Sequence, residues 1–582
     1  MNQSVLKRLL AYTKPYMGYF AGSVISAVLS VALTLLAPVL IGDAIDFIVG
    51  AGTVDFESIL PILGWLALSI FLAALFQWVL ALCNNTLTQK TVKSMRIAVF
   101  NKLNSVPLKY IDAHAHGDLN SRVINDIEQI GDGLLQGFTQ LFTGVITILG
   151  TLIFMLSINV TIAVTVVILT PVSLFVASFI AKRSHNSFAK QSKTRGEIGG
   201  YTEEMISNQK VIKAFCYEKR SQETFEEINH RLYESGVKSQ FYSSMTNPCT
   251  RFVNGLVYAA VGIIGAVSAL SGRLSIGQIS CFLTYANQYT KPFNEISGVI
   301  TELQTAFASA RRIFHVLDEP SEPIRSDALE AKDCKGKVDI KDVSFSYRQG
   351  VPLIEHLNLS VSEHQKIAIV GPTGCGKTTV INLLMRFYDV KKGEIAVDGT
   401  DIQKLSRNSL RRFYGMVLQE TWLFHGTVRE NIAYGKPDAS EEEILAASKA
   451  AYAHSFIKRL PQGYDTVISE DGGNLSQGQK QLLCIARAML TKPPMLILDE
   501  ATSSIDTRTE LRIQKAFEEM MQGRTSFVVA HRLSTIVNAD TILVMNQGKI
   551  MEQGNHRELL KKNGFYANLY NSQFAGQAEP SG

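Results

Sequence analysis

The sequence is short of the residues that build disulfide frameworks and zinc sites. Its 582 residues include seven cysteines, none of them in a C-x-x-C pair. We therefore expect neither a disulfide network nor a cysteine-rich zinc site, and the thiols fit a reducing compartment. The formal net charge is only +5, and the basic residues gather beside apolar stretches. That pattern favours a membrane surface over nucleic acid as the partner. The first apolar stretch is too long for a signal-peptide core and lacks an A-x-A-like site, so we expect no cleavable signal peptide.

Long apolar stretches, by contrast, fill the first half of the sequence. A helix that crosses a bilayer needs ~20 apolar residues. Any single stretch of this kind can be the buried helix of a soluble protein, but six in one half of the chain favour a membrane domain. The six are residues 17–49, 60–82, 138–156, 160–180, 252–269 and 276–299.

The distribution of Lys and Arg predicts which loops face the cytoplasm. The N-terminal segment and the connections at residues 83–137 and 181–251 are rich in both. The loop between the first two spans has Asp55 and Glu57 but neither Lys nor Arg. By the positive-inside rule, both termini and both long connections are cytoplasmic. We therefore expect a multi-pass protein of the inner (cytoplasmic) membrane, with the lipid bilayer as one partner.

Two features of the spans and connections leave alternatives open. Each long connection contains a break, near Asp112 and near Gln209, where a helix can turn back, although plain solvated helix explains both equally well. Lys291, which precedes Pro292, lies in the last span, where a charge is costly. In one interpretation Lys291 lines a water-filled substrate path. In the other, the predicted bounds of this span are wrong, and Lys291 lies at the cytoplasmic rim with its ammonium in water.

The composition changes after the last span. We expect a membrane domain at residues 1–318, a polar, Pro-containing linker at 319–337, a soluble α/β domain at 338–573 and a disordered tail at 574–582.

A glycine-rich loop in the α/β domain has the pattern G-x-x-x-x-G-K-[ST] of a P-loop. It consists of Gly371, Pro372, Thr373, Gly374, Cys375, Gly376, Lys377 and Thr378. An apolar run precedes it, and a helical pattern that begins at Thr379 follows. Backbone N–H groups of such a loop and the start of the following helix form an anion site. Lys377 can reach the β- and γ-phosphates of a nucleotide, and the Thr378 hydroxyl can hold Mg²⁺.

Polar residues follow three further apolar runs of this domain. Asp499 and Glu500 end one run, His531 ends the next, and Gln419 follows a third. Beside a P-loop, Asp499 can bind Mg²⁺ and Glu500 can polarise an attacking water. His531 can reach the γ-phosphate, and the Gln419 amide can sense the metal or the water.

In their order along the chain, these motifs resemble those of an ATP-binding cassette (ABC) transporter. The resemblance covers nearly the whole chain and includes, besides the P-loop, Tyr347, Gln419, residues 475–479 (Leu-Ser-Gln-Gly-Gln), Asp499, Glu500, residues 503–506 (Ser-Ser-Ile-Asp) and His531. Six spans before one such domain resemble an ABC exporter half-transporter. The resemblance implies a membrane domain of six long helices joined to an α/β P-loop nucleotide-binding domain.

The resemblance also implies a mechanism with residue roles. Two nucleotide domains would close head to tail over two ATP molecules, each held between the P-loop of one chain and residues 475–479 of the other. Tyr347 would stack on adenine, while the P-loop and Thr379 would hold phosphate, with Thr378, Gln419 and Asp499 around Mg²⁺. Glu500 would act as general base and His531 would contact the γ-phosphate. The partner's ATP would be served by Ser476, Gly478, Gln479 and Asp506.

One residue departs from the family pattern. Gln477 stands where the family usually has Gly. This departure suggests that the chain is one half of a heterodimer with unequal ATP sites. The alternative is a homodimer that tolerates Gln477. The resemblance implies ATP-driven export of amphipathic drugs, lipids or peptides. A gated channel that uses the same engine is the alternative, and the short linker disfavours it.

Overall fold

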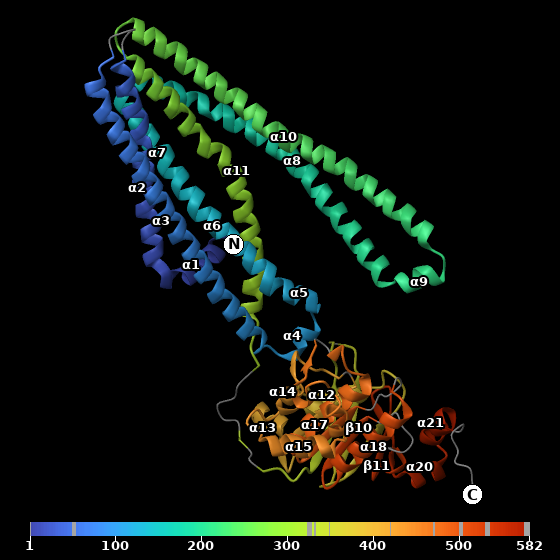
Figure 1. The fold of residues 1–582 in the computed structure, drawn as a ribbon. Helices are drawn as coiled ribbons and strands as arrows, with labels where there is room; N and C mark the ends of the chain where they lie inside the picture. The colour runs from blue at the N-terminus through green and yellow to red at the C-terminus, as the bar shows by residue number, and fades with distance from the viewer. Residues whose placement is uncertain are drawn as a thin grey trace. The chain divides into compact units, whose positions relative to one another are not determined.

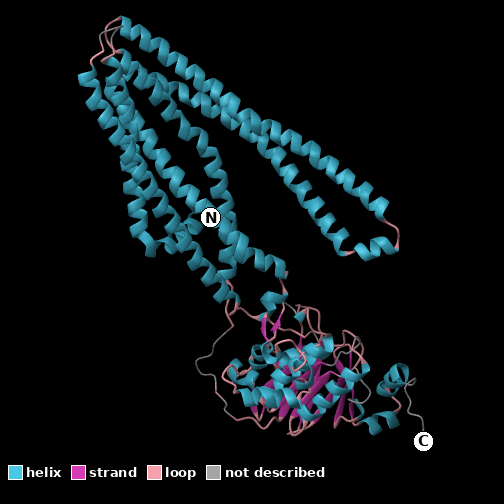
Figure 2. Ribbon diagram, viewed as in Figure 1, coloured by secondary structure: helices cyan, strands magenta, loops and turns pink. Residues whose placement is uncertain are grey.

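The computed structural model describes residues 2–48, 54–322, 329–330, 333–348, 350–419, 421–469, 472–499, 505–529 and 536–574. The chain divides into two compact units, Met1–Ser105 with His114–Glu319, and Val106–Ala113 with Pro320–Gly582. Within the described ranges the first unit is built from helices, and the named strands all belong to the second (Figure 2). The short segment Val106–Ala113 therefore packs with the second unit, although its neighbours in sequence belong to the first.

The first unit consists of long helices joined by short turns (Figure 1). Its elements are α1 (Asn2–Thr13), η1 (Lys14–Tyr16), α2 (Met17–Asp46), α3 (Phe56–Leu103), α5 (His116–Ser121), the π-helical η2 (Arg122–Asp126), α6 (Ile127–Gln136), the π-helical η3 (Gly137–Leu141), α7 (Phe142–Ile158), α8 (Val160–Ser207), α9 (Gln209–Ala214), α10 (Glu218–Leu270) and α11 (Ile276–Asp318).

The apolar sequence of these helices suits a bilayer, where every backbone polar group must be bonded internally. Among the described residues, four helical stretches are long and apolar enough to cross a membrane. They are Val5–Asp46, Phe56–Leu103, His116–Ile158 and Glu218–Leu270; in α8 the apolar stretch is the shorter Val160–Val172. At 1.5 Å per residue, α8 and α10 measure ~70–80 Å. That length exceeds the ~30 Å hydrocarbon core, so both helices extend well beyond the bilayer.

Helices α8 and α10 run side by side, and the short α9 joins their far ends (Figure 1). Helices α2 and α11 approach each other closely. A Cβ on Gly42 would lie 2.7 Å from the backbone oxygen of Gly277, so only glycine permits this approach. Two hydrogen bonds close the same contact: Gly277 N–H donates to Asp46 Oδ1 (2.7 Å), and the Tyr285 hydroxyl donates to the Leu35 carbonyl (2.6 Å).

A buried carboxylate connects η2 to the far end of α11. The Asp126 side chain accepts from the Ser309 hydroxyl (3.1 Å) and from Arg312 Nε (2.8 Å), and Arg312 Nη2 adds a second bond. Gln129 Oε1 lies 3.0 Å from the same Ser309 hydroxyl, whose single proton Asp126 and Gln129 share. A buried carboxylate is tolerated because it is paired and hydrogen-bonded, so this network holds the two helices in register.

The second unit is an α/β fold with two main sheets. The larger, of six strands in the order β12-β11-β3-β10-β9-β6, is parallel except for β12; the smaller is antiparallel, in the order β2-β1-β4-β5, and β7 pairs with β8. The strands are β1 (Val338–Phe345), β2 (Ile354–Val361), β3 (Lys366–Val370), β4 (Lys392–Val397), β5 (Thr400–Asp401), β6 (Tyr414–Val417), β7 (Gly426–Thr427), β8 (Val467–Ile468), β9 (Met495–Asp499), β10 (Thr525–Val529), β11 (Thr541–Asn546) and β12 (Lys549–Gly554).

Helices alternate with these strands along the second unit. They are α12 (Lys377–Leu384), α13 (Arg407–Arg412), α14 (Val428–Ala433), α15 (Glu441–Ala450), α16 (His454–Ile457), α17 (Gln477–Thr491), α18 (Thr507–Met521), α20 (His556–Lys562) and α21 (Phe565–Phe574), with a 3-10 turn η4 (Gly463–Asp465) and α4 (Leu108–Asp112) from the first half of the chain.

Strand β9 is apolar at every position before Asp499 because both of its faces are covered. Met495 and Ile497 pack into the core around α12 and the antiparallel sheet, while Leu496 and Leu498 pack into the core around α14, α15, α17 and α18. A parallel strand covered on both faces must be apolar at every position. Its first polar residue, Asp499, marks the end of the strand. Because β3, β10, β9 and β6 are parallel neighbours, the residues that follow them meet at one edge of the sheet.

Candidate functional site

A cavity of about 460 Å³ lies at the carboxyl edge of the larger sheet. The P-loop follows β3, and Asp499 and Gln419 come from the ends of β9 and β6. The lining residues are Leu353, Thr373, Gly374, Gly376, Lys377, Thr378, Thr379, Gln419, Asp499 and Val529. The fold therefore brings together the P-loop, Gln419 and Asp499, although the P-loop and Asp499 lie more than 120 positions apart in the sequence.

The P-loop conformation depends on its glycines. Gly376, the residue that precedes α12, has φ = +105°, and Gly374 has φ = +81°, a left-handed conformation that favours glycine. A Cβ on Gly374 would meet nothing within 4 Å, so this stretch of backbone is open to a ligand. At Gly371, by contrast, a Cβ would collide with the backbone of Met545 on β11. At Gly374, glycine permits the left-handed backbone and leaves it exposed. At Gly371, glycine permits close packing against β11.

Lys377 lies across the loop. Its Nζ donates to the carbonyl oxygens of Gly371 (2.7 Å) and Pro372 (3.0 Å) and lies 4.0 Å from Cys375 Sγ. Cys375 is buried beneath the loop, with 3% of its surface exposed. Gly371, Pro372 and Cys375 are not among the residues that line the cavity.

The lining residues fit a nucleotide phosphate group with Mg²⁺. The open loop backbone and Lys377 suit phosphate oxygens. The oxygens of Thr378, Gln419 and Asp499 are the hard ligands that Mg²⁺ prefers. Mg²⁺ bound there would neutralise charge on the phosphate oxygens.

Tyr347 is anchored beside this cavity. Its hydroxyl donates to Thr379 Oγ1 (3.3 Å) and accepts from Asn382 Nδ2 (3.0 Å), both on α12. Its ring meets the ring of Tyr388 edge-on, with centroids 4.8 Å apart. The Tyr388 hydroxyl in turn donates to Asp112 at the end of α4. Burial, followed by the neighbouring Asp112 carboxylate, raises the pKa of Tyr388 above its usual range, so the hydroxyl keeps its proton and the donor role.

Sequence reasoning missed Asn382, Tyr388 and Leu353. Asn382 lies three residues after Thr379 on the same helix, so helical periodicity could have indicated that it faces Tyr347. Tyr388 and Leu353 carry no comparable signal, because their places depend on how separate segments pack.

Residues 475–479 form the beginning of helix α17. The Ser476 hydroxyl accepts from Gln479 N–H (3.4 Å), and Gln479 Oε1 accepts from Ser476 N–H (2.9 Å). This is a capping box, which satisfies two unpaired N–H groups of a helix start. The pattern S-x-x-Q in the sequence is its signal. Gln479 therefore has a structural role within its own chain, besides any contact with a partner's nucleotide.

Gln477 points back to its own chain. Its Nε2 donates to Thr421 Oγ1 (3.2 Å), two residues after Gln419. The preceding Ser476 and the following Gly478 are likewise absent from the cavity's lining residues. The cavity therefore lacks the Leu-Ser-Gln-Gly-Gln segment of the same chain.

Asp506 is the N-cap of α18, and its Oδ1 accepts from Thr509 N–H (2.9 Å). This backbone hydrogen bond is the main cause that lowers the pKa of Asp506. Glu500 and His531 lie outside the described residues. The residue directly before Glu500, Asp499, lines the cavity, and so does Val529, two residues before His531.

Comparisons with known proteins agree with this arrangement. Residues 20–293 match the family model of the ABC transporter transmembrane region, and residues 354–503 match the family model described as ABC transporter. An uncharacterized ABC transporter ATP-binding protein of Bacillus subtilis (strain 168) is 42% identical over 574 residues, which are 98% of this chain and 95% of that protein. A fatty acid ABC transporter ATP-binding/permease protein of Mycobacterium tuberculosis (strain CDC 1551 / Oshkosh) is 43% identical over 514 residues, which are 88% of this chain and 81% of that protein.

The structure of a bacterial Atm1-family ABC exporter with ATP bound is similar over 99% of this chain and 100% of that one. The TM-score is 0.77 at 28% sequence identity. The similarity thus extends over both units of the chain.

Proposed function

The chain belongs to the ABC transporter family, as a multi-pass membrane ATPase of the exporter type, and on this premise we propose its substrates, its partner and its site residues. It exports amphipathic or hydrophobic molecules, such as drugs, lipids or peptides, across the cytoplasmic membrane. The nucleotide-binding domain, residues 338–573, and both termini face the cytoplasm. Residues 1–318 form the membrane domain, and the linker 319–337 joins the two. The fatty acid transporter among the similar proteins supports a lipid-like substrate.

The observation that carries the proposal is the composition of the cavity. It collects the P-loop, Gln419 and Asp499 but contains no residue of the Leu-Ser-Gln-Gly-Gln segment. A second half-transporter would supply that segment, so two chains would close over each ATP. The closed state binds ATP more tightly than the open state does. This difference in affinity drives the change from an inward-facing to an outward-facing membrane domain. Hydrolysis resets it.

Each site residue has a role that follows from its chemistry. The P-loop amides, Lys377 and Thr379 hold the phosphates, while Thr378, Gln419 and Asp499 surround Mg²⁺. Tyr347 stacks on adenine. Glu500 accepts the proton of the attacking water as general base, and His531 contacts the γ-phosphate. Ser476, Gly478, Gln479 and Asp506 face the partner's ATP.

Glu500→Gln tests the general base directly. The amide cannot accept the proton, so ATP should stay bound and the transporter should remain closed and outward-facing. The expected result is ATP retained after gel filtration together with near-complete loss of phosphate release. Unchanged turnover would remove Glu500 from this role.

We further propose that the partner is a different chain. Gln477 replaces the usual Gly where a side chain would lie near the partner's γ-phosphate, which would weaken one of two sites. A homodimeric lipid or peptide exporter is the alternative. Purification of this chain alone separates the two, because a heterodimer half should show little ATPase. Brisk, substrate-stimulated ATPase without a second polypeptide would establish the homodimer.

A further inference from the structure

A lysine held by two tyrosines marks the point where α2 begins. Lys90 Nζ, on α3, donates to the Tyr19 hydroxyl (3.0 Å) and lies 4.5 Å from the centroid of the Tyr19 ring and 5.8 Å from that of Tyr16. The Tyr16 and Ser94 hydroxyls are hydrogen-bonded at 2.9 Å, which fixes the Tyr16 ring. Lys90 is half-buried, so its ammonium is positioned by contacts with the rings and does not move freely in solvent.

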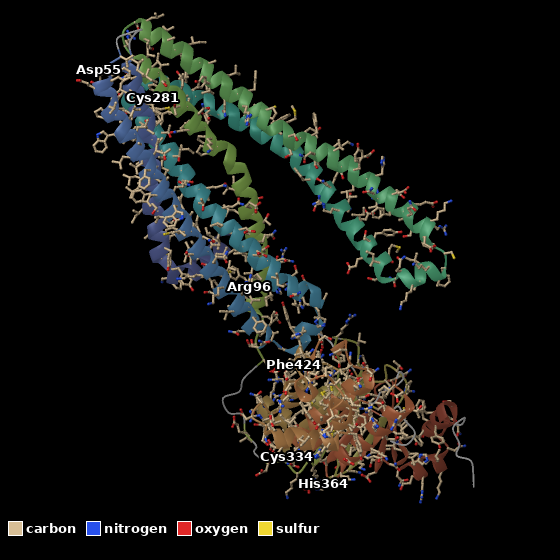
Figure 3. All side chains as sticks on the ribbon, in the orientation of Figure 1. Asp55, Arg96, Cys281, Cys334, His364 and Phe424 are labelled. Carbon is tan, nitrogen blue, oxygen red and sulfur yellow. The ribbon has the colours of Figure 1, made fainter. Side chains whose placement is uncertain are left out.

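This cluster lies at one margin of the apolar spans. The apolar run of α3 ends near residue 82, and Lys90 follows about eight residues, ~12 Å of helix, later. Its side chain reaches back to Tyr19, near the start of the apolar run of α2. Figure 3 labels Asp55 and Arg96 near opposite ends of α3, and Lys90 belongs to the Arg96 end. Tyrosine and lysine at such a margin suit the headgroup layer of a bilayer. With the orientation proposed above, this is the cytoplasmic leaflet.

The two chain segments that carry the cluster hold charges of one sign. Residues 1–42 and 58–111 contain no Asp or Glu, although they include Lys7, Arg8, Lys14, Lys90, Lys93, Arg96, Lys102 and Lys109. Arg8 is paired with Asp318 at 2.7 Å. Two exposed lysines lie near the cluster in sequence: Lys14 is two residues before Tyr16, and Lys93 is three residues after Lys90. An anionic group at this place would therefore meet several cations and no carboxylate from either segment.

Apolar side chains are exposed beside these cations. Helix α1 buries Val5 and Leu9 against α3 but exposes Leu6 (43%) and Leu10 (44%), and Met17 at the start of α2 is 51% exposed. Exposed leucines together with Lys7 and Arg8 on one short helix are typical of a helix that lies in the membrane interface. The surface thus offers contacts both for acyl chains and for an anionic headgroup.

We propose that Lys90, Tyr19 and Tyr16 form a binding site for the headgroup of an anionic phospholipid of the adjoining leaflet. A Lys ammonium has three N–H donors, and only one is engaged by Tyr19. The other two N–H groups and the Tyr19 O–H would donate hydrogen bonds to one phosphate. Lys14 and Lys93 add charge at the rim, and the acyl chains lie along Met17 and the exposed leucines of α1. The proposal rests on the membrane orientation and is independent of the ATP mechanism.

Lipid retention tests this site without reference to ATPase activity. The full-length chain in detergent is incubated with equimolar phosphatidylglycerol and phosphatidylcholine of the same acyl chains, and bound lipid is counted by native mass spectrometry. Wild type should retain phosphatidylglycerol preferentially. Lys90→Gln should weaken that binding about fivefold, the effect of one interfacial cation. Lys90→Arg, which keeps the charge, should retain the preference.

Two further variants separate a built site from diffuse attraction. Lys238→Gln removes an exposed lysine of α10 and should leave the preference unchanged. Tyr19→Phe keeps every charge but removes the hydroxyl, and should weaken phosphatidylglycerol binding about two- to tenfold. If Lys90→Gln or Tyr19→Phe binds like wild type, or if Lys238→Gln loses as much as Lys90→Gln, the proposal is wrong. Thermal unfolding confirms that each variant is folded; if Lys90→Gln is not, Tyr19→Phe and Lys90→Arg decide.

Discussion

Gly478 allows a test of why a glycine is needed in the Leu-Ser-Gln-Gly-Gln segment. Gly478 is the second residue of α17 and packs against the start of α18. A Cβ at this position would lie within 3.0 Å of Thr509 Cγ2 and 3.1 Å from Ile505 Cγ2. The glycine is therefore required for helix packing within this chain, whatever it contributes to a partner's ATP.

The expected cost of Gly478→Ala follows from this geometry. Forcing a methyl group into a packed site costs ~1–3 kcal/mol. In a domain of about 150–250 residues, 1 kcal/mol shifts Tm by ~2–4 °C. Gly478→Ala should therefore lower the Tm of the nucleotide-binding domain by ~2–12 °C, measured by intrinsic fluorescence of the full-length protein in detergent.

A compensating variant makes the test specific. Thr509→Ser removes the methyl group that the new Cβ would meet and keeps the hydroxyl, so the double variant should recover part of the lost stability. Gly199→Ala is the control: this glycine lies in α8, a Cβ there meets nothing within 4 Å, and alanine is the better helix former. Unchanged Tm in Gly478→Ala, or no recovery with Thr509→Ser, would refute the packing explanation.

Three further predictions concern the same domain. Tyr388→Phe removes the hydrogen bond to Asp112 but keeps the ring against Tyr347, so stimulation of ATPase by amphipathic compounds should fall about two- to tenfold while basal kcat holds; full stimulation would contradict this link. Alkylation of Cys375 by a maleimide should be slow because the thiol is buried, should abolish nucleotide binding and should be prevented by ATP; an alkylated protein with full ATPase would disprove it. The backbone hydrogen bond that lowers the Asp506 pKa stabilises the fold at neutral pH, and this contribution is lost as pH falls through the lowered pKa. The Tm difference between wild type and Asp506→Asn should therefore become smaller in acid. A larger difference in acid would show that Asp506 does not stabilise the fold through its ionised form.

The parts of the fold that were predictable depend on short stretches of sequence. The P-loop lies between an apolar run and a helical pattern, and β3 and α12 are found on either side of it. The membrane-crossing parts of the long helices follow from apolar runs, because a helix is the one open structure that satisfies its backbone in lipid. The breaks expected near Asp112 and Gln209 appear as the short helices α4 and α9. In each case the determining interactions lie within a few residues along the chain.

The sequence by itself therefore determined the identity and order of the motifs, the membrane-spanning character of the first half and the strand–loop–helix elements around the P-loop of the second. Only the tertiary structure decided what these residues contact. It turns Gln477 toward Thr421 and packs Gly478 against Thr509. It links Tyr347 through Tyr388 to Asp112, more than 230 residues away in the sequence. Such contacts depend on the relative placement of separate elements, which local propensity does not specify and which packing of the two cores alone defines.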